Sequence, residues 1–151
     1  MICEIGVNAG HSLLLMLENN PNDSYLVFDL NRHRYTEPCL NYIRSQFPKT
    51  KIISIFGDSR KTVPEYILNN PNEIHKYDLI HIDGGHDTEI VLSDFNSCKI
   101  LTANDGVTIF DDYNYPNIYK FINEKISLNQ IVPYSNIGLL KTNLHFVYKF
   151  N

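Results

Sequence analysis

The sequence lacks the features that mark several large classes of protein. It has only 3 cysteines, Cys3, Cys39 and Cys98, and their wide spacing indicates neither a disulfide framework nor a zinc site of the Cys-x-x-Cys type. No apolar run approaches the roughly 20 residues that span a bilayer, and the first residues do not form a signal peptide. We therefore expect a cytoplasmic protein with reduced thiols.

Long basic runs are also missing, and the formal net charge is -4. Nucleic acids and anionic membranes attract proteins through clustered Lys and Arg, so we expect neither as the main partner. A small molecule is the expected ligand. With 151 residues, 43% of them hydrophobic and 20% charged, the sequence predicts a single domain over 1–151.

What is present is an alternation of short, β-rich apolar runs with longer stretches of helical spacing. This pattern is typical of an α/β fold, here a Rossmann-like, doubly wound and mostly parallel sheet of six to seven strands. The predicted strands are Ile2–Ile5, Tyr25–Asp29, Lys51–Phe56, Tyr77–Asp83, Gly106–Asp111, Gln130–Tyr134 and Leu144–Phe150. The last one alternates apolar and polar residues, which favours an antiparallel strand. Between strands, Val91, Phe95, Cys98 and Leu101 share one face of a predicted helix.

Polar residues gather where the first five strands end, which is where ligands bind in open parallel sheets. After the first strand, Gly6 and Gly10 let the chain turn tightly, and the amides that open the next helix favour negative groups. The dinucleotide fingerprint has a second glycine where Asn8 stands, and Glu4 adds negative charge that disfavours a pyrophosphate. A zwitterion with a carboxylate and an ammonium suits this turn better, although a simple strand-to-helix turn is the alternative.

Three more residues follow the second and third strands. Asp29 stands where an acid can accept hydrogen bonds from both ribose hydroxyls, or it caps the helix that follows. Asp58 can meet the exocyclic amine of adenine while Ser59 caps the next helix, or both residues only cap.

Five segments together resemble the class I S-adenosylmethionine-dependent methyltransferases, in particular the small-molecule O-methyltransferases with a strand-ending IDG-x-H motif. They are CEIGVNAGHSLLLML, VFDLN, IFGDSR, YDLIHIDGGHDTEIVLSDF and ILTANDGVTIFDDY, in that order over about residues 2–113. The resemblance implies S-adenosylmethionine as cofactor. The residues that it places at the cofactor are Glu4, Gly6, Asn8, Gly10 and Ser12 at the methionine part, Asp29 at the ribose, Asp58 and Ser59 at the adenine, and Asp83 beside them.

Asp83, Asp111 and Asp112 end neighbouring strands of the predicted sheet. Three carboxylates in one crevice repel each other unless protons or a cation neutralise them, and an all-oxygen set suits Mg²⁺. The match resembles metal-dependent O-methyltransferases that act on catechols or on sugar hydroxyls. His86 is the candidate base, with Asp83 as the second catalytic residue, because an ordinary imidazole titrates at about pH 6.5.

These assignments have plainer alternatives. Asp111 and Asp112 could end a strand and cap the next helix, Asp83 could only orient the cofactor, and His86 could be an exposed residue at a helix start. His81, within a strand, is expected to be a core histidine with satisfied hydrogen bonds.

Members of the group usually carry helices before the first strand that cover the acceptor pocket, whereas this chain begins almost at that strand. It is either a minimal form or lacks an N-terminal segment, and a homodimer could complete the pocket. Two other functions stay open: an NAD-type oxidoreductase, for which a third loop glycine is missing, and a methyltransferase-like domain that has lost catalysis and serves as a binding or assembly module.

Overall fold

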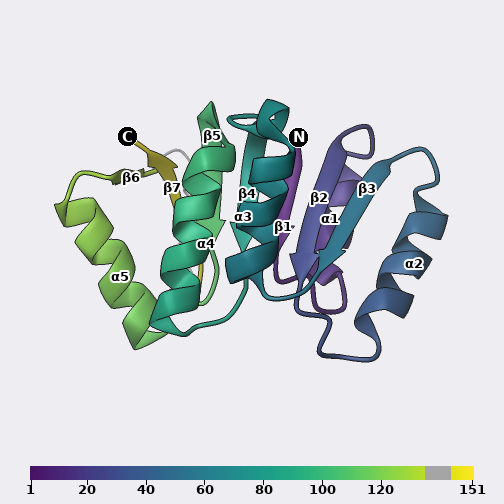
Figure 1. The fold of residues 1–151 in the computed structure, drawn as a ribbon, viewed down its shortest axis with the longest axis horizontal. Helices are drawn as coiled ribbons and strands as arrows, with labels where there is room; N and C mark the ends of the chain where they lie inside the picture. The colour runs from purple at the N-terminus through teal and green to yellow at the C-terminus, as the bar shows by residue number, and fades with distance from the viewer. Residues whose placement is uncertain (135–143) are drawn as a thin grey trace.

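A seven-stranded sheet in the order β3-β2-β1-β4-β5-β7-β6 forms the centre of the protein (Figure 1). The computed structural model describes residues 1–134 and 144–151. The strands are β1 Ile2–Ile5, β2 Ser24–Asp29, β3 Lys51–Phe56, β4 Tyr77–Ile82, β5 Thr102–Phe110, β6 Ile131–Pro133 and β7 Phe146–Phe150. The helices are α1 His11–Asn19, α2 Thr36–Gln46, α3 Ser59–Asn69, α4 Thr88–Leu101 and α5 Pro116–Ser127, with a short 3-10 turn over Pro71–Glu73.

Strands β1 to β5 pair in parallel, which confirms the predicted α/β class and brings their carboxyl ends to one edge of the sheet. β7 pairs antiparallel with both β5 and β6, as the alternating pattern of the last strand predicts. Because β7 runs against β5, its first residues lie beside the last residues of β5. Among the described helices, none is long and apolar enough to cross a membrane.

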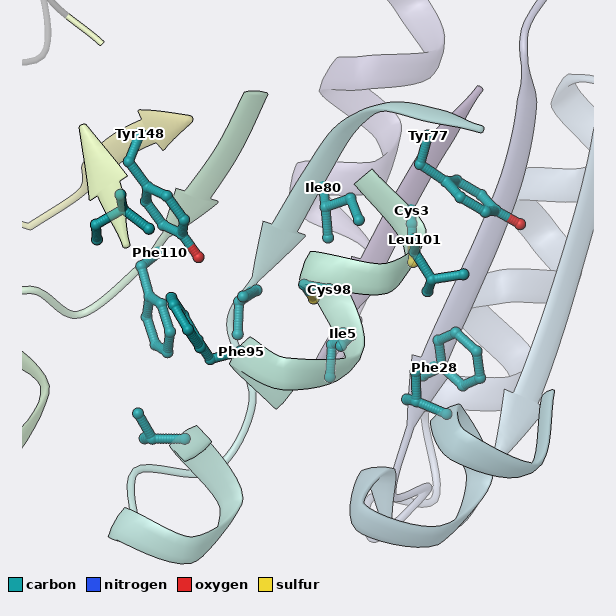
Figure 2. Packing of buried hydrophobic residues seen from close by; sticks show 14 of the residues in the cluster. Cys3, Ile5, Phe28, Tyr77, Ile80, Phe95, Cys98, Leu101, Phe110 and Tyr148 are labelled. Carbon is teal, nitrogen blue, oxygen red and sulfur yellow. The ribbon is translucent and has the colours of Figure 1, made fainter. Parts of the chain in front are cut away.

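Two apolar clusters cover the two faces of the sheet. One joins residues of α3, α4 and α5 to alternate residues of the central strands, including Cys3 and Ile80. Figure 2 shows Phe95, Cys98 and Leu101 of α4 in this cluster. The other cluster lies under α1 and α2 and contains Ile2, Val27, Leu13, Leu17, Leu40 and Ile43. The strands are therefore apolar on both faces, as expected for a parallel sheet covered by helices.

β5 begins earlier than the sequence predicts. Thr102 already pairs with Tyr77, and the next pair is Leu79 with Val107. Between these pairs β4 contains one residue, whereas β5 contains the stretch 103–106, so Asn104 and Asp105 bulge out as exposed residues inside the strand. The predicted start at Gly106 was wrong because turn-forming residues inside a strand produce a bulge as readily as a loop.

Candidate active site

The loop after β1 is built around glycine. Gly6 has a φ of 93°, and a Cβ added there would lie 1.9 Å from the carbonyl oxygen of Asp83. Gly10, with a φ of 81°, is the N-cap of α1, and a Cβ there would lie 2.5 Å from Ile43 Cδ1. The backbone conformation favours glycine at both positions, and at Gly6 the close approach of the β4 end requires it, so the loop lies directly against the end of β4.

Glu4 is in β1, beneath this loop. Its side chain is fully buried, and Oε1 accepts hydrogen bonds from the Ser12 hydroxyl and from His81 Nδ1, the latter at 2.9 Å. Oε2 is also buried and has no hydrogen-bond partner within residues 1–134 and 144–151. A buried carboxylate oxygen without a partner fits a cationic group close by. The contact of Glu4 with a ligand ammonium stays a prediction, since Glu4 does not line the cavity described below.

His81 is a core histidine with a defined role in this network. It lies beside Glu4 in the register of β1 and β4, and its Nε2 is 3.9 Å from Asp111 Oδ2. Burial disfavours the charged imidazole, but the hydrogen bond that His81 donates to Glu4 and the negative charge of Glu4 outweigh burial and raise the pKa of His81. His81 thus links the buried Glu4 to the acids at the end of β5.

Asp29 ends β2 with its carboxylate already oriented. The backbone amide of Asn8 donates to Oδ2 at 2.8 Å and that of Asn31 donates to Oδ1 at 2.6 Å. The Tyr35 hydroxyl in turn donates to Asn8 Oδ1 at 2.7 Å, which ties the loop after β2 to the glycine loop. Each carboxylate oxygen can still accept a further hydrogen bond, so Asp29 is prepared to bind a pair of hydroxyls.

Asp58 is the N-cap of α3 and accepts a hydrogen bond from the amide of Arg60 at 3.0 Å. The Arg60 guanidinium also donates to it at 2.6 Å, and the pKa of Asp58 falls to about 2 mainly through these hydrogen bonds. The capping role that the sequence left open is therefore present. A role at adenine stays a prediction.

The acids that follow β4 and β5 lie close to each other. Burial and the negative charge of Asp111 raise the pKa of Asp83 to about 6. Asp111 Oδ1 is 2.6 Å from His145 Nδ1, and Asp112 Oδ2 is 2.7 Å from His86 Nε2. The structure therefore brings Asp83 and Asp111 together and pairs Asp112 with the candidate base.

The donor set partly fits a divalent cation. Burial and then the charge of Asp111 raise the pKa of Asp83, and a hard cation would relieve the repulsion between these two carboxylates. In the described parts of the chain, however, no three His, Cys, Asp or Glu side chains are already grouped to hold a metal. Asp112 would have to leave His86 to join the other two acids.

A cavity of about 570 Å³ opens at this edge of the sheet. Of the residues predicted from the sequence, Gly6, Asn8, Asp29, Asp58, Ser59, Asp83 and His86 line it, whereas Glu4, Gly10, Ser12, Asp111 and Asp112 do not. Its size is that of a typical small-molecule site.

The arginines that line the cavity lie on one side of it, beside Asp29 and Asp58. Arg32 and His33 line it from the loop after β2 and Arg60 lines it from the first turn of α3, and sequence reasoning missed all three. Asp83 lines it from the end of β4, on the side of the remaining acids.

The sequence from residue 3 to 113 matches the family model described as a methyltransferase domain, which is well over half of the chain. The chain belongs to this methyltransferase family. The predicted resemblance is thereby confirmed for the family and, through the strand order, for the fold. No curated protein matches the sequence.

Solved structures of methyltransferases share this fold. The apo structure of CalS11, a TDP-rhamnose 3'-O-methyltransferase of calicheamicin biosynthesis, superposes with a TM-score of 0.76 at 17% identity, covering 98% of this chain and 70% of that one. A putative caffeoyl-CoA O-methyltransferase from Staphylococcus aureus gives 0.72 at 16%, covering 99% and 75%. MycE of the mycinamycin pathway, in complex with Mg and SAH, gives 0.67 at 15%, covering 99% of this chain and 44% of MycE.

Proposed function

We propose that this methyltransferase transfers a methyl group from S-adenosylmethionine to a hydroxyl of a small molecule, with the help of a divalent cation. The observation that carries the proposal is the cavity at the carboxyl edge, with the oriented Asp29 at one side and Asp83 and His86 at the other. An electropositive methyl donor suits the acidic side, and a diphosphate does not. The similar structures named for O-methylation and for bound Mg support the same proposal.

Each group then has a chemical task. Asp29 accepts hydrogen bonds from the ribose hydroxyls, and the amides opening α1 face the cofactor carboxylate. Asp83 and Asp111, joined by Asp112, would hold the cation, which lowers the pKa of an acceptor hydroxyl when bound. While His86 Nε2 is paired with Asp112 it cannot accept a proton, so we propose that Asp112 leaves it for the cation and that the freed Nε2 then takes the hydroxyl proton.

Binding of S-adenosylhomocysteine, measured by titration calorimetry, tests the cofactor assignment. We expect Asp29→Asn to weaken the affinity about 10- to 100-fold, because one of two charge-assisted hydrogen bonds to the ribose is lost. Asp105→Asn removes the same charge from the exposed bulge of β5 and should bind like the wild type. A wild-type protein that binds no S-adenosylhomocysteine, with and without Mg²⁺, would contradict the proposal.

His86 is tested separately by turnover. With TDP-rhamnose and catechol as trial acceptors, we expect His86→Ala to lower kcat about 100-fold, because the acceptor hydroxyl loses the group that takes its proton. Asn117→Ala is the matched control, because Asn117 Nδ2 donates to the backbone carbonyl of His86 and leaves the imidazole untouched. An unchanged kcat in His86→Ala would show that another group removes the proton. Cofactor binding without turnover on either acceptor would favour the binding or assembly module.

A further inference from the structure

Asp94 is a carboxylate on the apolar face of α4. Its neighbours on that face are Val91, Phe95 and Cys98, which all belong to the larger core cluster. Asp94 is only 1% exposed, and neither carboxylate oxygen has a well-formed hydrogen bond to any residue that the structure describes. A buried carboxylate in this state is costly, since it has lost its hydration without a compensating donor.

Asp94 lies next to two segments that line the cavity. Its Oδ2 lies 3.0 Å from the position of a Cβ on Gly84, in the loop between β4 and α4. From the other side the Ser59 side chain, at the start of α3, faces the carboxylate and lowers its pKa. Gly84 and Ser59 both line the cavity. Asp94 therefore lies beneath the junction of two cavity segments that come from different parts of the chain.

Burial and the neighbouring groups set the pKa of Asp94. Burial raises its pKa to about 6, and Asp58 adds to the rise, whereas Ser59 and Arg60 oppose it. Burial, and to a smaller extent the charge of Asp94, raise the pKa of Cys3 and Cys98, so both thiols stay neutral. At neutral pH Asp94 is thus an ionised acceptor, with donors beside it that are not yet aligned.

We propose that Asp94 is a positioning residue for the cofactor pocket: it accepts hydrogen bonds from the start of α3 and from the β4–α4 loop when the cofactor draws these two segments together. The inference rests on the proposed function. The cost of the unsatisfied carboxylate in the free protein is relieved on binding, so Asp94 stabilises the bound arrangement over the free one.

Calorimetry with S-adenosylhomocysteine tests the inference. At pH 7.5 we expect Asp94→Asn to bind about 10-fold more weakly than the wild type and than Asp105→Asn, the exposed control. The difference should vanish at pH 5, where Asp94 of the wild type is protonated and resembles the neutral amide. An affinity of Asp94→Asn equal to that of the wild type at pH 7.5 would overturn the inference.

Stability of the free protein gives a second readout. The folded pKa of Asp94, about 6, exceeds its ordinary value of 3.8, so its contribution to stability is present below pH 4 and is lost as the pH rises through 6. Asp94→Asn should therefore raise the Tm of the free protein by about 2–4 °C at pH 7.5 and not at pH 4. A lower Tm with unchanged affinity would identify a merely structural residue and overturn the inference.

Ser59→Ala keeps the inference testable if Asp94→Asn does not fold. It removes the donor that faces Asp94, so we expect it to weaken S-adenosylhomocysteine binding several-fold at pH 7.5 and hardly at pH 5. In the double variant, Asp94→Asn should add little to the effect of Ser59→Ala, and full additivity would overturn the coupling. A wild type without S-adenosylhomocysteine binding would instead refute the proposed function itself.

Discussion

Gly6→Ala is expected to destabilise the protein by more than about 3 kcal/mol, enough to lower its Tm by about 10 °C. The new Cβ would lie 1.9 Å from the Asp83 carbonyl oxygen, and the φ of 93° is strained for any residue with a side chain. Neither backbone segment can retreat easily, because the amide of Gly6 donates to the Phe28 carbonyl at 2.8 Å. Urea unfolding monitored by circular dichroism measures the change.

Gly85→Ala is the matched comparison. A Cβ at Gly85 would meet the side chain of Ile90, with Cδ1 at 2.7 Å and Cγ2 at 3.3 Å, and a side chain can give way more easily than the backbone that Gly6 faces. We expect a loss of less than about 1 kcal/mol there. If both variants lost the same stability, the close approach of the glycine loop to β4 would not be a requirement of the fold.

Asp111→Asn is expected to lower Mg²⁺-dependent turnover more than about 1000-fold while changing S-adenosylhomocysteine affinity less than about threefold. Asp111 does not line the cavity, but its carboxylate lies beside Asp83 at the place where the cation would bind. Methyl transfer measured across an Mg²⁺ titration, with a chelator as the zero point, gives both the rate and the metal dependence. Full activity of this variant in chelator would refute the proposal that a divalent cation assists the reaction.

Asp112 is a candidate for two roles, cation ligand and hydrogen-bond partner of His86, and the variant Asp112→Asn separates them. As a cation ligand Asp112 would set the Mg²⁺ midpoint, whereas as the partner of His86 at 2.7 Å it would set only kcat. Under the proposed function we expect the variant to lose Mg²⁺ activation, as Asp111→Asn does. A lower kcat with an unchanged Mg²⁺ midpoint would assign Asp112 to the imidazole alone.

Most of the fold could be predicted because the short apolar runs predict the strands and the apolar residues at helical spacing predict the helices. β1 and β3 have the predicted bounds, since both are bounded by turn or loop residues and covered by helices. The start of β5 could not be predicted in this way. Asn104, Asp105 and Gly106 favour a turn, and such residues occur in a bulge inside a strand as well as in a loop before it. The sheet partners decide between the two, and they lie far away in the sequence.

The candidate site was predictable where it depends on the end of a parallel strand. Asp29, Asp58 and Asp83 line the cavity for this reason. His145 was missed, although the antiparallel direction of the last strand contains the signal: Phe146 pairs with Phe110, so the preceding residue comes beside Asp111.

Asp94 was missed for a different reason. A single acid on an otherwise apolar helical face is normally assigned to the exposed boundary of that face, and only the packing against Gly84 and Ser59 shows that it is buried. The depth of Glu4 was likewise beyond the sequence, since its hydrogen bonds come from Ser12 and His81 on other elements.

The division of charge across the cavity has a consequence for the reaction cycle. On the side of β2 and β3 the arginines Arg32 and Arg60 lie beside Asp29 and Asp58, whereas Asp83 lines the side of β4 with no arginine or lysine among the lining residues there. Under the proposed function the sulfonium of the donor faces Asp83 and the spent thioether carries no charge, so Asp83 would attract the donor more strongly than the by-product. The polarity of the crevice thus gives the exchange of by-product for fresh donor a direction, and that preference should weaken as added salt screens it.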